Sequence, residues 1–223
     1  KTFTGGTSLI DLSGNSRTGT VSQTNGNYGA ATFLSSNHTL PHDGEYFTFS
    51  NDNNTITTPN LKNEIIDSPN NESHTTEIWI YPTGDGVVVQ YNGQPTPNTI
   101  YHHSAIEIND GKLAFGVWGP YLTSSKGFIE PITFNQWHQV VLTYNGSSNE
   151  LKGYLDGNLI NGSTYIQEWQ QPSSFYINIG HEEITNMSSS ADAFSGKFGL
   201  FRVYNDALTD QEVLNNFSNN FKT

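Results

Sequence analysis

The sequence has 223 residues and contains no cysteine. This absence excludes a disulfide framework and every metal site that depends on thiolate ligands. It does not fix the compartment, because an extracellular protein can also do without disulfides. A chain of this length can bury a core of ordinary size, and β-sandwiches of similar length are routinely one domain.

Basic residues are scarce. Nine lysines and arginines stand against 21 aspartates and glutamates, which gives a formal net charge of −12 at pH 7. This charge repels the phosphate backbone of nucleic acids and anionic membrane surfaces. The sequence also lacks an apolar run that approaches the length of a bilayer span. We therefore expect neither nucleic-acid binding nor membrane insertion.

Several catalytic and cofactor motifs are missing as well. No glycine-rich phosphate-binding pattern follows a predicted strand, and no helical His-x-x-x-His pair is present to bind zinc. His102 and His103 are adjacent, so their side chains diverge on a strand. The nearest approach to the carboxylate pair of a glycoside hydrolase is Glu107 with Asp110, whose odd spacing puts them on opposite faces of a regular strand. Asp110 is better explained by a turn, and the sequence favours a non-catalytic protein.

Aromatic residues, in contrast, make up 13% of the chain, which suits strands. The clearest strands lie in residues 137–160. Val140, Leu142 and Tyr144 share one face of the first strand, and after an NGSSN turn the residues of odd number in 151–155 continue that face. Asp156-Gly157 tolerates the positive φ of a tight turn into a third strand. The pattern predicts a β-meander with one buried face.

Further strands are predicted on both sides of this meander. Residues 1–27 are expected to hold one or two edge strands between loops, and residues 60–73 a loop with at most one helical turn. The remaining predicted strands span residues 32–40, 46–58, 77–81, 87–91, 104–108, 112–118, 174–180 and 197–204.

One short helix is predicted near the end of the chain. Thr209 and Glu212 have the spacing of a capping box, and Leu208 and Val213 that of a hydrophobic staple. The helix should begin at Asp210 and continue to about residue 216. The side chains expected to pack on the sandwich are Val213, Leu214 and Phe217.

Three segments carry a resemblance to a known family. Trp137-His138 opens an apolar strand, and the next strand ends in Tyr154-Leu155-Asp156-Gly157. Residues 8–15 read SLIDLSGN, and residues 194–208 read FSGKFGLFRVYNDAL. In this order the segments resemble the central hairpin, the opening and the closing strand of laminin-G-like (concanavalin A-like) jelly-roll domains. The resemblance implies an all-β fold, namely a two-sheet antiparallel β-sandwich with one short C-terminal helix, as a single domain over residues 1–223.

The acidic loop after residue 180 carries a further resemblance. Residues 179–183 read IGHEE and residues 192–196 read DAFSG, a combination that resembles the calcium-binding loop of the pentraxins. By position the resemblance implies Glu182, Glu183 and Asp192 as calcium ligands, with an oxygen such as that of Asn98 from elsewhere. Ile184 departs from the pattern, because it stands where the pentraxins have an acidic ligand. The alternative is a solvated acidic loop in an acidic protein.

Aromatic side chains are the other candidates for ligand contact. Sugar rings stack their apolar faces on Trp or Tyr, while sugar hydroxyls need polar side chains nearby. Trp118 and Tyr121 lie at a strand end, Trp169 lies in a polar loop, and Tyr91 precedes an Asn-Gly turn. For each of them, packing in the core or in a loop is the alternative to ligand contact.

The resemblance and the missing catalytic pair together predict a non-catalytic recognition module that binds a glycan or cell-surface polysaccharide. We expect an adhesive, secreted or virion-associated protein, located outside the cell, on its surface or on a virion, as a homo-oligomer or in a larger assembly. Two alternatives stay open. One is a structural subunit or protein–protein interaction domain of a virion or extracellular assembly, and the other is a glycoside hydrolase or lyase of the same superfamily.

Overall fold

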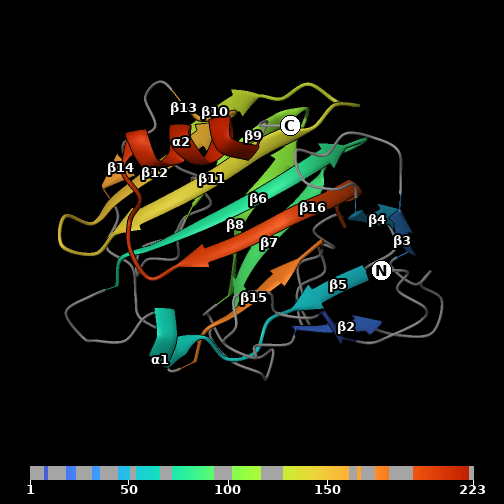
Figure 1. Cartoon of the computed structure of the whole chain (residues 1–223), viewed down its shortest axis with the longest axis horizontal. Coiled ribbons are helices and arrows are strands. Elements are labelled where there is room, and N and C mark those ends of the chain that lie inside the picture. The colour runs from blue at the N-terminus through green and yellow to red at the C-terminus, as the bar shows by residue number, and fades with distance from the viewer. Residues whose placement is uncertain are drawn as a thin grey trace.

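The fold is a sandwich of two sheets packed face to face (Figure 1). The computed structural model describes residues 8–9, 19–23, 32–35, 45–50, 54–65, 72–92, 102–116, 128–160, 165–166, 174–180 and 193–220. Within this part of the chain every pairing between named strands is antiparallel. The predicted all-β sandwich with a short C-terminal helix is confirmed.

Each sheet has eight strands among the described residues. Sheet 1 consists of β1 (Ser8–Leu9), β2 (Gly19–Gln23), β5 (Asn54–Thr57), β15 (Tyr176–Ile179), β7 (Gly86–Asn92), β8 (His102–Asn109), β9 (Lys112–Phe115) and β10 (Phe128–Pro131), in that spatial order. Sheet 2 consists of β13 (Asn158–Leu159), β12 (Glu150–Leu155), β11 (His138–Asn145), β6 (His74–Pro82), β16 (Ser195–Tyr204), β4 (Glu45–Ser50) and β3 (Thr32–Ser35), with β14 (Tyr165–Ile166) beside β12.

The chain changes sheets where the sequence predicts a single strand over residues 46–58, and that prediction is wrong. β4 pairs with β3 and β16 in sheet 2, whereas β5 pairs with β2 and β15 in sheet 1. Residues 50–55 are all polar and interrupt the alternation between the two strands, but a local pattern carries no signal of which sheet a strand joins. The helical turn expected in residues 60–73 is present as α1 (Lys62–Ile65).

The interior between the sheets is filled by the inward residues of both. Ile78 and Ile80 of β6, Ile106 of β8 and Phe175 before β15 are completely buried in one apolar cluster. On β6 these inward isoleucines alternate with Glu77, Trp79 and Tyr81, which therefore point to the outer face of sheet 2. This strand thus gives the outer face of sheet 2 both aromatic side chains and a carboxylate.

The central meander has the predicted register. Val140 lies opposite Leu155, Leu142 opposite Gly153, and Tyr144 opposite Leu151. The prediction that only one of its faces is buried is wrong, because Val141 and Tyr154 on the other face are 1% and 0% exposed. They pack with Val213 of helix α2 (Asp210–Asn220), which lies across the outer face of sheet 2 over β11 and β12 (Figure 1).

Helix α2 begins with the predicted capping box. The Thr209 N–H donates to Glu212 Oε2 (2.8 Å), and the Glu212 N–H donates back to Thr209 Oγ1 (3.3 Å). Leu208 packs against the Val213 cluster, as expected of the staple. Leu214, predicted to be packed, is instead 39% exposed, because it lies on the solvent side of the helix. No helix of the described residues is long and apolar enough to cross a membrane.

The turn before β13 fits closely under this helix. Asp156 and Gly157 have φ values of 52° and 75°, as the tight-turn prediction requires. A Cβ placed on Gly157 would lie 2.9 Å from Cβ of Phe217, whose ring stacks on Trp79 of β6. Glycine at position 157 therefore allows both the positive φ of the turn and the close packing of Phe217 of α2 against it.

Candidate functional site

Seven of the eight residues that the sequence suggests for ligand or metal contact lie outside the described part of the chain. They are Asn98, Trp118, Tyr121, Trp169, Glu182, Glu183 and Asp192. Among the residues that the structure describes, no group of three or more His, Cys, Asp or Glu side chains could hold a metal ion. Calcium binding at the acidic loop stays a prediction.

Tyr91, the eighth, lies in the core. Its side chain is 4% exposed, and its hydroxyl forms a 2.7 Å hydrogen bond with Thr76 Oγ1. The ring packs against His74 and Phe175, with centroid separations of 5.3 and 5.1 Å. Burial raises the pKa of the Tyr91 hydroxyl. Tyr91 thus follows the core-packing alternative, and the prediction of a ligand contact there is wrong.

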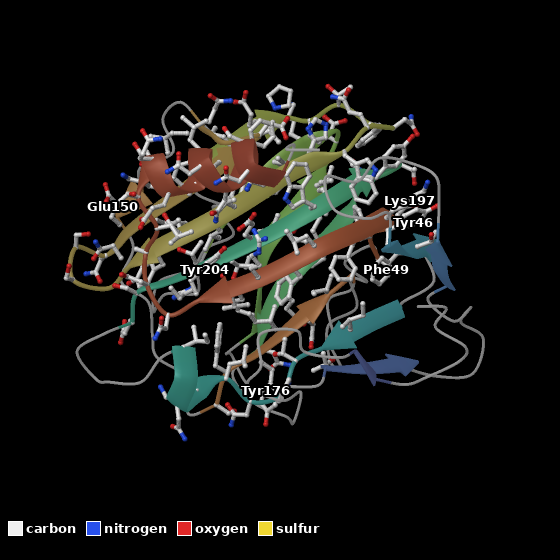
Figure 2. The ribbon with its side chains drawn as sticks, viewed as in Figure 1. Tyr46, Phe49, Glu150, Tyr176, Lys197 and Tyr204 are labelled. Atoms are coloured by element: carbon white, nitrogen blue, oxygen red, sulfur yellow. The ribbon has the colours of Figure 1, made fainter. Side chains whose placement is uncertain are left out.

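A different group of side chains gathers on the outer face of sheet 2. The aromatic–lysine cluster consists of Tyr46, Tyr81, Trp137 and Lys197. The Lys197 ammonium lies over both tyrosine rings, 4.6 Å from the centroid of Tyr46 and 4.8 Å from that of Tyr81. Trp137 meets the two tyrosines edge to face, at centroid separations of 6.0 and 5.7 Å. Figure 2 shows Lys197 and Tyr46 beside each other at the β4 end of β16.

Strand register brings the cluster together from four places in the sequence. Lys197 of β16 lies directly opposite Tyr81 of β6 on one side and Thr48 of β4 on the other. Tyr46 shares the outer face of β4 with Thr48, because side chains two residues apart point the same way. Trp137 precedes β11, whose first residue, His138, pairs with Ile80. Tyr81, Trp137 and Lys197 all keep part of their surface open to solvent.

The tryptophan is held by its neighbour in the sequence. His138 contacts Oδ2 of Asp156 through Nδ1 (2.8 Å) and the carbonyl oxygen of Thr133 through Nε2 (2.9 Å). The other oxygen of Asp156 accepts the N–H of Gln139 (2.9 Å). The Trp-His pair and the Leu-Asp-Gly turn are therefore bonded to each other. They fix the start of β11, and with it Trp137, at the rim of the sheet.

Close approach of two strands sets the position of Lys197. A Cβ on the preceding residue, Gly196, would lie 2.4 Å from the carbonyl oxygen of Tyr81 and 2.7 Å from the Phe194 ring. Gly196 also has φ of 153°, a conformation that L side chains rarely adopt. Only glycine lets β16 approach β6 this closely, and the next residue then projects beside Tyr81.

The surroundings of the Lys197 ammonium differ from those of three other basic groups on the described surface. Lys112, Lys152 and Arg202 each lie within salt-bridge distance of a carboxylate, at 3.9, 3.3 and 3.3 Å. Within the described residues, Lys197 has no carboxylate at such a distance and no hydrogen-bond acceptor for its ammonium. Its charge is stabilised by the two ring faces, an interaction worth about 0.5–2 kcal/mol.

A second polar group on the same sheet has a structural role. Glu77 is completely buried, and its carboxylate accepts bonds from Gln139 Nε2 (2.8 Å), the Tyr204 hydroxyl (2.9 Å), Asn216 Nδ2 (3.0 Å) and Arg202 Nη1 (3.3 Å). Burial, followed by the charge of Glu77, raises the pKa of Tyr204 to about 12. Because Asn216 belongs to α2, this network fastens the helix to the sheet and leaves no free carboxylate for chemistry.

A bulge in β16 places both cations on this face. Phe198 pairs with Ile80 and Phe201 with Ile78, so β16 has one residue more than β6 between the two pairs. Both phenylalanines therefore contact the core, while Lys197 and Arg202 point outward on either side of the bulge. Tyr204, further along β16, lies toward the opposite end of the strand from Lys197 (Figure 2).

The sequence contained part of the signal for the aromatic–lysine cluster. Tyr46 alternates with the apolar Phe47 and Phe49, and Tyr81 alternates with Ile78 and Ile80, which assigns each to an outer face. What the sequence could not show is that β4, β6 and β16 are neighbours, since their order in the sheet differs from their order in the chain. Trp137 stands out in the sequence only as part of a family motif.

The chain matches a known protein family. A family model described as the concanavalin A-like lectin/glucanases superfamily matches residues 49–214. The chain belongs to this superfamily. None of the curated proteins searched matches this concanavalin A-like chain.

Solved structures share its fold at low sequence identity. Domain 4 of AbnA, a GH43 extracellular arabinanase from Geobacillus stearothermophilus solved in complex with arabinotriose, has a TM-score of 0.60 and 16% identity, over 93% of this chain and 91% of that one. The receptor-binding domain of a botulinum neurotoxin C/D mosaic has a TM-score of 0.60 and 16% identity, over 94% of this chain and 48% of that one. Trypanosoma rangeli sialidase has a TM-score of 0.62 and 14% identity, over 97% of this chain and 31% of that one.

The concanavalin A-like fold thus occurs both within enzymes and in receptor-binding proteins. The chain spans about a third of the sialidase and about half of the toxin domain. Proteins with this fold include carbohydrate binders, such as the arabinanase domain with its arabinotriose, and a botulinum neurotoxin whose cell entry depends on two ganglioside molecules.

Proposed function

We propose that this chain is a non-catalytic carbohydrate-binding domain, and that it recognises glycans on a cell surface as part of a secreted or virion-associated protein. The observation that carries the proposal is the aromatic–lysine cluster on the outer face of sheet 2. Partly exposed Tyr81 and Trp137 offer apolar surfaces of the kind on which pyranose rings stack.

The rigidity of the cluster supports this role. Tyr46, Tyr81 and Lys197 come from strands, and the His138–Asp156 contact fixes the backbone beside Trp137. Aromatic side chains on strands lose little entropy on binding, because they are already ordered. A sugar that stacks there would need no rearrangement of the sandwich.

Four of the described carboxylates have structural roles, which supports binding rather than hydrolysis. Asp85 accepts the N–H groups of Asp110 and Gly111 (2.8 and 3.0 Å) and thereby closes the turn between β8 and β9. Asp110 itself has φ of 52° in that turn, in agreement with its predicted role. Asp156 and Glu77 are occupied by the contacts described above. Cleavage of a glycosidic bond would instead need two carboxyl groups facing each other across the sugar.

A binding panel together with a turnover assay tests the proposal. The protein is applied to an array of neutral and acidic glycans, and the bound glycans are then incubated with it in a reducing-sugar assay. Binding without release of reducing ends is the expected result. Release of reducing ends would replace the proposal with the glycoside hydrolase or lyase alternative, and failure to bind any glycan would favour the structural-subunit alternative.

Two variants locate the binding site. Trp137→Ala removes the largest aromatic surface of the cluster, and we expect it to weaken glycan binding by about tenfold. Leu214→Ala is the matched control, because Leu214 is also exposed and apolar but lies on α2. Both variants should melt as single cooperative transitions. Equal affinity of the two variants would show that the glycan binds elsewhere on the molecule.

A further inference from the structure

Lys197 suggests which kind of sugar the cluster would take. Its ammonium has three N–H groups, and in the described part of the chain none of them meets a carboxylate or a hydrogen-bond acceptor. A cation fixed at one point, with unused donors and two aromatic rings around it, is suited to an anionic group on a ligand.

We infer that the aromatic–lysine cluster binds a sugar that carries a carboxylate, such as a uronic acid or sialic acid residue, with the carboxylate on Lys197 and the ring against Trp137 and Tyr81. This inference rests on the proposed function and narrows it to one ligand class. The rings of Tyr46 and Tyr81 hold the Lys197 ammonium in place before the ligand arrives, so little side-chain entropy is lost when the bond forms.

The overall charge favours a ligand with a single negative charge at this point. At −12, the protein repels polyanions, and the repulsion grows with every further charge on the ligand. A carboxylate brings one charge and can accept the unused N–H bonds of one lysine. A sulfate or phosphate cluster would need more cations than the one that lies among these rings.

The test compares one sugar in three chemical forms. The probes are an oligosaccharide that ends in glucuronic acid, its methyl ester and the corresponding glucose compound, with a sialic acid-terminated oligosaccharide as a second acidic source. Affinities are measured by isothermal titration calorimetry at low and at high salt. We expect the acid forms to bind about tenfold more tightly than the ester or the neutral compound, and this preference to shrink as salt screens the charge.

Two variants at one position isolate the charge. Lys197→Met keeps the length of the side chain and removes the cation, so it should abolish the preference for acid over ester while retaining the affinity for the neutral compound. Lys197→Arg keeps the charge and should retain the preference. Circular dichroism and thermal melting of each variant establish that it is folded.

The outcomes distinguish failure of this inference from failure of the proposed glycan binding on which it rests. Equal binding of acid and ester by the wild type, or a preference that survives in Lys197→Met, would overturn the inference and leave glycan binding in place. Absence of binding to every one of these compounds would overturn the inference, whereas the proposed function falls only if no glycan of the array binds. A preference for only one of the two acidic sugars would identify which source the site recognises.

Discussion

The buried histidine of β6 should make the free energy of unfolding depend measurably on pH. His74 is completely buried, beside the rings of Tyr91, Tyr144 and Phe175 at centroid separations of 5.3, 5.6 and 5.9 Å. Burial lowers the pKa of His74 from 6.5 to about 4, and the 2.8 Å hydrogen bond with the Glu72 carbonyl oxygen offsets only part of that effect. The folded protein therefore keeps this imidazole neutral at pH values where the unfolded chain already protonates it.

The sign and size of the effect follow from this difference. Because the folded pKa lies below the unfolded pKa, the unfolded state gains protons first as the pH falls, and stability is lost from about pH 6.5 downward. The loss is complete below about pH 4, and it then amounts to about 3 kcal/mol, at about 1.4 kcal/mol per pH unit. Between about pH 7 and about pH 4.5, His74 alone should lower the free energy of unfolding by about 2 kcal/mol.

Urea denaturation of matched variants separates His74 from the carboxylates, which also titrate in this range. His74→Gln cannot take up the proton, so it should lose about 2 kcal/mol less than the wild type between about pH 7 and about pH 4.5. Ile177→Val, a change in the same core, should lower stability by about 1 kcal/mol at both pH values. Identical losses in wild type and His74→Gln would show that His74 does not stay neutral in the folded state, and would refute the reasoning.

Three shorter predictions concern the turn, the helix cap and calcium. Gly157→Ala should lower the free energy of unfolding by about 2 kcal/mol in urea denaturation, since the new Cβ meets Phe217. Gly111 has a similar φ of 67° but no atom within 4 Å of a new Cβ, so Gly111→Ala should lower the free energy of unfolding by about half as much. Equal losses in the two variants would contradict a role for the contact with Phe217. Thr209→Ala should cost about 1 kcal/mol in the same assay, and an unchanged midpoint would speak against the capping box. Calcium should raise the melting temperature relative to chelator, and Glu182→Gln should remove that difference; equal melting temperatures in both conditions would dismiss the calcium site.

Local sequence patterns predicted most of the elements. The register of the meander, the turn at Asp156-Gly157 and the capped helix depend on residues close together in the chain, and the structure has all three. The sheet to which each strand belongs depends on contacts between distant segments. The alternation of residues 46–49 is interrupted by the polar run of residues 50–55, but this interruption does not indicate which sheet the second strand joins.

The candidate site was harder to predict for the same reason. Aromatic residues next to turns look exposed in a sequence. Tyr91 nevertheless points inward, because it lies two residues after the buried Val89 and therefore on the same face of β7. Lys197 gave no signal of its own, since a lysine on a strand usually has solvent or a carboxylate as its neighbour. Its aromatic surroundings come from Tyr46, about 150 residues earlier, and such a neighbour follows only from the order of strands in sheet 2.

The bulge in β16 makes the number of residues in that strand more important than their identity. Lys197 and Arg202 are separated by an odd number of positions, so in a regular strand they would lie on opposite sides of the sheet. Deleting either Gly199 or Leu200 would make this separation even, so β16 could pair regularly with β6 while both cations stay on the outer face. A related chain of the same length that paired regularly, without the bulge, would instead turn one of the two cations toward the core. It would keep every charged residue and still lose either the ion pair with Glu77 or the cation among the aromatic rings. Comparisons within the superfamily should therefore count the residues of this strand before comparing their identities.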